Sequence, residues 1–541
     1  MTHGEFTESQ IKILEHFVTN TNGNVFVLRN LPEVIKGALF SRYSRSTLGL
    51  RSLLLKEFIL NEDMAFESIV GKQAGSDGNE DQSVAIQKAQ SFYDRILDGY
   101  GDDSIGELGG AHLAIENVSM LACKIIQDSR IGGSPLEKST RYIYFDQKVD
   151  GEYLFYKEPV LLTSAYRDLY LETCNLLFDT YNKLIPSLTA KIEVGFPKDP
   201  AISKGAYTAA LRAKVLDCLR GLLPASAMTN MGVFGNGRFY ETLLQKLNCH
   251  DLSEMGEIGR KAYAELGKVI PSFIRRSDPA HRHQQSFAKF KETIEKNIGQ
   301  AAEKHSEHFK HSAIPGVRLV QFDKNSPALV AGALLFPHTQ GSLDKIQAYC
   351  ASLPDAEREE ILETAAIGRE NQRHKSPRAL EHASFTFEIV ADFGVYRDLQ
   401  RHRILTQDRQ RLTCDCGYYI PSEIIGTEME EDYALAMEKA KKGYDRIASE
   451  LPEEAQYIVP MAYNIRWYFH INLRGLQWLS ELRSQAAGHP NYRYIAQEMA
   501  RQVSLALPSF ERFFKFVDFE GYQLGRLGAE IRQEEKMKAK I

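Results

Sequence analysis

The chain has 541 residues, 43% of them hydrophobic and 10% aromatic, which is enough apolar surface for sizeable cores and excludes disorder as the main state. At ~150 residues per domain, this length suggests three or four domains, or two large ones. The 66 Lys and Arg residues are outnumbered by 71 Asp and Glu residues, giving a net charge of −5. Such a balance gives no bulk attraction to nucleic acid or to anionic membranes, and we expect neither as a partner.

No targeting or membrane-spanning segment is predicted. The first residues lack a basic stretch followed by an apolar one. Apolar runs such as residues 53–58 are interrupted by charge, far short of the ~20 residues that span a bilayer. Seven scattered cysteines argue against a disulfide scaffold and for a reducing compartment. We therefore expect a cytoplasmic protein.

Two similar stretches stand near the start of each half of the chain. Residues 25–28 lead into the apolar stretch 31–40, and residues 317–320 lead into the apolar stretch 328–336. Each pattern predicts a short strand, a turn and the start of an apolar helix.

The similarity continues downstream. Pro224 is predicted to open a helical stretch, with Asn236 and Arg238 at offsets 12 and 14, and the same offsets from Pro460 again give an Asn and an Arg. The shift between matching residues falls from 295 (Ala38 to Ala333) to 274 (Glu107 to Glu381) and 236 (Pro224 to Pro460). We interpret the chain as two diverged copies of one domain, the first copy carrying insertions.

The predicted boundaries are a first copy at residues 1–275, a linker at 276–315 and a second copy at 316–541. The linker contains His305, His308 and His311 at helical spacing, which could bind a metal. No carboxylate or cysteine with ligand spacing accompanies them, so a solvated linker helix is favoured and we expect no metal.

Each copy mixes short strand-like runs with long amphipathic helices. Residues 384–391 alternate as a strand should, with Phe385, Phe387 and Ile389 on one face. Residues 434–450 and 492–505 are predicted helices. The predicted class is α+β, each copy holding a small mixed or antiparallel sheet with long helices, because no regular βαβ alternation is present.

Three cationic clusters interrupt otherwise apolar segments. One is Arg401-His402-Arg403, which on composition alone suits a surface patch. A second, residues 134–142, suits either a loop that grips a phosphorylated sugar or a polar turn. The third suits an anionic ligand as well as it suits a solvent-facing basic helix face. Aromatic residues stand between its members, which are Arg466, Arg474, Arg483, His489 and Arg493.

Taken together, these residues resemble the signature of flavin-dependent thymidylate synthases. That signature runs Arg-His-Arg, two residues, Ser, one residue, Asn-Glu, one residue, Ser, one residue, Arg-Tyr. The second copy is similar to its first part at residues 401–406, with Thr406 for Ser, and then departs. The first copy is similar to its second part, with matches at Ser134, Glu137, Ser139, Arg141 and Tyr142. Each copy therefore keeps most of what the other has lost, although Leu136 and Asp408 replace the Asn in the two copies.

The resemblance implies an enzyme that reductively methylates dUMP to dTMP with FAD, methylenetetrahydrofolate and NADPH. The alternatives are a related C5 modification of another pyrimidine nucleotide, or a catalytically silent flavin- or nucleotide-binding protein. In the family, sites form between subunits of a homotetramer. Two tandem chains are therefore expected to form a homodimer, a pseudo-tetramer with composite sites between unlike copies.

Residue roles follow from the same resemblance. Arg493 is the candidate catalytic residue, stabilising negative charge on the uracil ring. Ser139 and Arg141 are expected to hold the dUMP phosphate, with Arg466 opposite. The expected cofactor-binding residues are Arg401, His402, Arg403, Arg483, His489 and Glu137.

Overall fold

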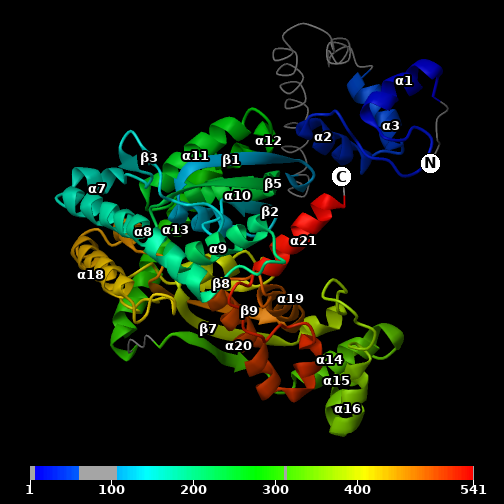
Figure 1. The fold of residues 1–541 in the computed structure, drawn as a ribbon. Coiled ribbons are helices and arrows are strands. Elements are labelled where there is room, and N and C mark those ends of the chain that lie inside the picture. Colours follow the sequence, from blue (N-terminus) through cyan, green and yellow to red (C-terminus); the bar gives the residue numbers. More distant parts are fainter. Residues whose placement is uncertain (1–5, 60–105, 310–313, 540–541) are drawn as a thin grey trace. The chain divides into compact units, whose positions relative to one another are not determined.

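The computed structural model describes residues 6–59, 106–309 and 314–539 (Figure 1). It divides the chain into two compact units. Unit 1 comprises residues 1–116, 125–137 and 230–309, and unit 2 comprises 117–124, 138–229 and 310–541. The units do not follow the two sequence copies, because unit 2 holds the second copy together with a large part of the first. The division of the sequence at 275 and 315 stays a prediction.

Unit 1 is built on a three-stranded sheet of order β1-β5-β2, in which β2 runs antiparallel to β5. The strands are β1 (Gly110–Ser119), β2 (Gly133–Glu137) and β5 (Met228–Asn236). The helices are α1 (Glu8–Phe17), α2 (Glu33–Tyr43), α3 (Leu50–Leu53), η1 (Leu54–Ile59), α10 (Gly237–Leu247), α11 (Ser253–Leu266), α12 (Pro271–Ile274), η5 (Arg275–Ser277), α13 (Arg282–His305) and η6 (Ser306–His308). Helix α6 (Met120–Gln127) follows β1 in the chain.

Unit 2 contains a four-stranded antiparallel sheet of order β6-β7-β9-β8. The strands are β6 (Gly316–Phe322), β7 (Ser384–Asp392), β8 (Thr406–Arg409) and β9 (Asn464–Asn472), and β3 (Lys148–Val149) pairs separately with β4 (Glu152–Tyr153). The longer helices are α8 (Arg167–Gly195), α9 (Lys204–Leu219), α14 (Ser326–Leu335), α15 (Leu343–Ser352), α16 (Asp355–Glu363), α18 (Glu428–Ala448), α19 (Leu473–Arg483), α20 (Pro490–Ala506) and α21 (Leu527–Lys538). Shorter ones are α7 (Pro159–Thr163), η4 (Arg220–Leu222), η7 (Phe336–His338), η8 (Arg378–His382), α17 (Phe393–Leu399), η9 (Glu454–Ile458) and η10 (Pro508–Phe514).

The elements predicted in the second copy are confirmed. Phe385, Phe387 and Ile389 of β7 are completely buried, as the alternation required. Helix α18 begins earlier than predicted because Thr427 caps it and three glutamates follow in its first turn. The α+β class with antiparallel sheets is also confirmed.

Two predictions of secondary structure were wrong. Residues 25–28 form no strand: Leu28 makes a single bridge to Val18, while Val25 and Val27 are exposed and pair with no sheet. The stretches after Pro224 and Pro460 begin as the strands β5 and β9, and each becomes a helix only where its strand ends. A nine-residue strand buried on alternate positions was mistaken for the start of that helix.

Matching residues of the two copies have matching roles. Asn236 caps α10 by accepting from the amide of Phe239 at 2.9 Å, and Asn472 caps α19 by accepting from that of Gly475 at 2.8 Å. The arginine two places later pairs with the matching glutamate in each copy. These ion pairs are Arg238–Glu107 and Arg474–Glu381.

Within unit 2 the matching prolines meet. Pro224 and Pro460 form an antiparallel bridge, flanked by backbone hydrogen bonds between residues 221–226 and 457–462. Antiparallel pairing of equivalent residues is the geometry of a two-fold axis. The two copies are therefore joined here as the two halves of a symmetric dimer would be.

The predicted linker is largely helical. Helix α13 occupies most of the predicted linker and is largely exposed, while His311 lies outside the described residues. Among residues 6–59, 106–309 and 314–539, no His, Cys, Asp and Glu side chains group in a way that would hold a metal ion. In the same ranges, no helix combines the length and apolar character that crossing a membrane needs.

Candidate functional site

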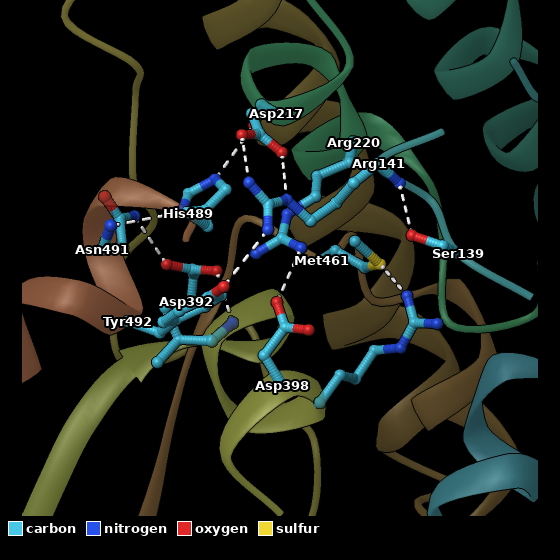
Figure 2. Close-up of polar contacts among 12 residues, drawn as sticks. Ser139, Arg141, Asp217, Arg220, Asp392, Asp398, Met461, His489, Asn491 and Tyr492 are labelled. Carbon is cyan, nitrogen blue, oxygen red and sulfur yellow. Dashed lines mark hydrogen bonds and ion pairs between the residues drawn. The ribbon is translucent and has the colours of Figure 1, made fainter. Parts of the chain in front are cut away.

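The loop at residues 139–141 of the first copy is held by a buried ion pair. Arg141 donates from Nε to Asp217 Oδ1 at 2.5 Å and from Nη2 to Asp217 Oδ2 at 2.7 Å, and its backbone amide donates to Ser139 Oγ (Figure 2). Burial alone would lower the pKa of Arg141, but the Asp217 carboxylate outweighs it and raises that pKa. Burial would likewise raise the pKa of Asp217, and Arg141 holds it below its ordinary value. Both groups are charged.

The same guanidinium reaches the second copy. Arg141 donates to the hydroxyl of Tyr492 and to the carbonyl of Ala487, each at 3.2 Å. Both acceptors belong to the segment around helix α20, which carries the predicted residues His489 and Arg493. Unit 2 therefore brings the Ser-x-Arg loop of one copy against the arginine-rich segment of the other.

Asp398 ties together arginines from both copies. Its carboxylate accepts from Arg220 Nη1 at 3.0 Å and from Arg401 Nη2 at 2.9 Å (Figure 2 shows the first of these). Burial would raise the pKa of Asp398, but the surrounding arginines hold it far below its ordinary value. The buried Nη2 of Arg220 has no hydrogen-bond partner among the described residues. One donor in this cluster is therefore left without an acceptor in the part of the chain that the structure describes.

The Arg-His-Arg segment is exposed at its ends and buried at its centre. Arg401 and Arg403 face solvent, whereas His402 is buried and accepts at Nε2 from Arg483 Nε at 2.8 Å. Burial, and then the charges of Arg483 and Arg401, hold the pKa of His402 well below its ordinary value. Burial and Arg401 also lower the pKa of Arg483. His402 is therefore a neutral acceptor in a cluster where positive charge is in excess.

His489 is also neutral. It caps α20 by accepting at Nδ1 from the amide of Asn491, so its Nε2–H donates to the carbonyl of Asp217 at 3.1 Å. Burial, and then the charge of Arg220, lower the pKa of His489 to about 3. Asn491 in turn donates to Asp392 at 2.8 Å (Figure 2).

Arg493 lies buried next to this cluster. It donates from Nε to the carbonyl of Ser484 at 2.7 Å and from Nη2 to the carbonyl of Glu520 at 2.8 Å. The nearest carboxylate that it pairs with, Asp518, is 3.8 Å away. Arg493 is therefore held mainly by two carbonyls, and its ion pair with Asp518 is long.

Two predicted residues lie apart from these contacts. Arg466, on β9, pairs with Glu388 of the neighbouring strand β7 at 3.2 Å. Glu137 belongs to unit 1, where its carboxylate accepts from Gln127 at 3.2 Å. Arg141 and His489 contact Asp217, and Arg401 contacts Asp398. Arg483 lies near Asp398, whose pKa it helps to lower, and it also donates to His402, whereas Arg403 is exposed.

Sequence reasoning missed the residues that hold this cluster together. Asp217 and Arg220 match no motif, and Tyr492 is one of the aromatic residues that stand among the arginines of the third cluster. One signal was available: Asp217 and Arg220 stand three places apart inside an otherwise apolar run, residues 215–223. Charges at such positions are buried and need partners.

Comparisons with known proteins agree with the repeat. The model of the family described as "Thymidylate synthase complementing protein" matches this chain twice, at residues 63–272 and 318–509. A "UPF0159 protein" of Chlamydia muridarum is 54% identical over 98% of this chain and 99% of its own length. A "UPF0159 protein Ta1429" of Thermoplasma acidophilum is 34% identical over 93% of this chain and 99% of its own. A "Flavin-dependent thymidylate synthase" of Clostridium tetani is 30% identical over 26% of this chain and 65% of its own. The chain belongs to the thymidylate synthase complementing protein family, as a tandem duplication of that family's domain.

Proposed function

We propose that the protein is a FAD-dependent thymidylate synthase that converts dUMP to dTMP with methylenetetrahydrofolate and NADPH. Family membership and the partial match to a flavin-dependent thymidylate synthase support this assignment. The observation that carries it is the contact of Arg141 with Tyr492 and Ala487, because it unites the half-motifs of the two copies in one compact unit.

The charge of the cluster fits phosphorylated ligands. Four arginines lie among three carboxylates, Asp217, Asp392 and Asp398, and one buried guanidinium nitrogen of Arg220 has no acceptor among the described residues. Positive charge in excess inside a partly buried site favours phosphate oxygens, which match the planar fork of arginine. The four arginines are Arg141, Arg220, Arg401 and Arg483.

In this assignment the exposed cations hold the cofactor. Arg401 and Arg403 bind phosphate oxygens of FAD, and Arg483 with His402 lies beside the flavin; His489 supports them from the start of α20. FAD, when bound, carries the hydride that reduces the transferred carbon. Ser139 and Arg141 hold the dUMP phosphate. This requires Arg141 to exchange its contacts with Tyr492 and Ala487 for phosphate oxygens.

Arg493 is assigned to the uracil ring. Its ion pair with Asp518 is long, at 3.8 Å, so the guanidinium remains able to stabilise negative charge that builds on the ring when C5 acts as nucleophile. The two carbonyls that accept from Nε and Nη2 orient the guanidinium and leave Nη1 for the ring.

One observation favours a second candidate, a catalytically silent flavin- or nucleotide-binding protein. Asp217 engages Arg141 on two nitrogens, and Asp398 engages Arg220 and Arg401. Carboxylates thus occupy arginines that a phosphate would use. Such a protein would bind ligands without turnover.

For the assembly we propose a homodimer, with each chain contributing two of the four domains of a pseudo-tetramer. The antiparallel bridge of Pro224 with Pro460 supports it, because it gives each chain an internal two-fold. Light scattering that shows a stable monomer would count against this assembly.

The test is the visible absorption spectrum of the purified protein, before and after addition of FAD and then of dUMP. We expect a bound-flavin spectrum that shifts with dUMP, and growth of a thymidine auxotroph that expresses the protein. Arg141→Ala should lose the dUMP shift and keep FAD, whereas Arg446→Ala, an exposed change on α18, should behave as wild type. A protein that takes up no FAD refutes the enzyme; binding without growth selects the silent alternative.

A further inference from the structure

The chain continues past the region that matches the family. The second match ends at residue 509, and the segment that follows includes helix α21. Residues 522–526 of this segment line a narrow cavity together with Arg141 and Asp217. Part of the wall beside the predicted phosphate-binding arginine therefore comes from outside the matched domain.

Arg526 holds the loop that carries Arg141. Its Nη1 donates to the hydroxyl of Tyr142, and its guanidinium carbon lies 4.2 Å from the centre of the Tyr142 ring. Its Nη2 donates to Glu530 Oε1 at 2.7 Å, one turn further along α21. Because Glu530 fixes the guanidinium, Arg526 is a rigid support for Tyr142, the neighbour of Arg141.

Helix α21 itself rests on α9, the helix that carries Asp217. Ser203, the N-cap residue of α9, donates to Glu534 Oε1 of α21 at 2.7 Å. The two groups that hold the loop, Arg526 above Tyr142 and Asp217 against Arg141, are thus carried by two helices in contact with each other.

The start of the same segment contacts Arg493. The carbonyl of Glu520 accepts from Arg493 Nη2, and the Tyr522 ring lies 4.8 Å from its guanidinium carbon. One continuous segment, residues 518–538, therefore contacts Arg493 directly and contacts Tyr142, the neighbour of Arg141. These are the two arginines to which we assign the nucleotide.

We propose that this C-terminal segment positions the nucleotide site, and that Arg526 is a positioning residue for the Ser139 to Arg141 loop. The inference rests on the proposed function, since it takes dUMP as the ligand of that loop. Arg526 itself touches no substrate. It acts by keeping Tyr142, and with it Arg141, in the conformation that accepts the phosphate.

The experiment compares full-length variants by titration with dUMP in the presence of FAD. Arg526→Ala should weaken dUMP binding about tenfold, because the stacked and hydrogen-bonded support of Tyr142 is lost. Affinity for FAD should stay at the wild-type value, and the melting temperature should fall only modestly, because the ion pair with Glu530 is lost. Arg526→Lys keeps the charge without the planar fork and should fall between the two. Arg532→Ala, an exposed arginine on the same helix, is the matched control and should bind as wild type.

If Arg526→Ala folds poorly, two further variants still test the inference. Tyr142→Phe removes only the hydroxyl, and we expect a smaller loss of dUMP affinity, with no further loss when Arg526→Lys is added. Unchanged dUMP affinity in Arg526→Ala and Tyr142→Phe would overturn the inference, as would a loss of FAD affinity as large as the loss of dUMP affinity. If the wild type binds FAD but no dUMP, both the proposed function and this inference are wrong. If the wild type binds both and the variants match it, this inference alone fails.

Discussion

The substitution Asp217→Asn tests whether the Arg141–Asp217 pair holds the candidate site together. Both side chains are 9% exposed, and the pair is bidentate. Removing one partner of a buried pair costs ~3–5 kcal/mol because the other charge stays buried without compensation. The amide of Asn still accepts from one guanidinium nitrogen, so we expect a loss near the lower end, about 3 kcal/mol.

Tryptophan fluorescence during urea unfolding is a suitable assay. The chain has two tryptophans, Trp467 and Trp478, and both lie in unit 2 with the ion pair. Trp467 is buried and reports the loss of the core around β9. The matched control is Asp432→Asn, which breaks the exposed pair with Lys183 and should cost at most about 1 kcal/mol.

The dependence of this effect on pH provides a second check. The folded-state pKa of Asp217 is held below its ordinary value, so its stabilisation is present above the unfolded pKa of about 3.9 and is lost as pH falls through the folded pKa. The difference between wild type and Asp217→Asn should therefore be constant near neutral pH and shrink below about pH 4. A loss equal to that of Asp432→Asn, or a difference that grows in acid, would refute the reasoning.

Two other residues give separate tests. Arg493→Ala should abolish turnover and leave bound FAD unchanged, as measured by assay and by flavin absorbance; loss of FAD would show that the assigned role is wrong. His489 has a folded-state pKa near 3, so the unfolded state binds one more proton between about pH 6.5 and pH 3, and stability is lost as pH falls through that window. His489→Asn keeps an N-cap oxygen and should reduce the slope of unfolding free energy against pH by about 1.4 kcal/mol per pH unit between pH 4 and 6; an unchanged slope would contradict the neutral, buried state of His489.

The parts of the fold that sequence predicted are those in which local pattern and burial coincide. Alternation in β7 placed three apolar side chains on the buried face, and helical spacing found α20. The same reasoning predicted the wrong secondary structure for the stretches after Pro224 and Pro460. There the strands β5 and β9 run into helices without a loop, and their identity depends on pairing with β2, β7 and β8, which the local sequence does not show.

In the candidate site, likewise, the sequence identifies some residues and not others. Motif spacing found Arg141, Arg401 and Arg483, because their order is distinctive. It did not find Asp217, whose partner Arg141 is 76 residues away in the chain. Nor did it find that Asp398 joins Arg220 to Arg401, since that cluster exists only when the copies are packed together.

The same packing leads to a prediction of one complete site per chain. Because the chain holds two copies of one domain, aligned residues of the copies can be compared position by position. Thr413 stands where the second copy would need the equivalent of Arg141, and Leu247, which is buried, stands where the first would need that of Arg483. At both positions the charge that would bind phosphate is therefore missing. Titration should therefore saturate at one FAD per chain, two per dimer; two per chain would show that the cations retained in unit 2 are not what selects the cofactor.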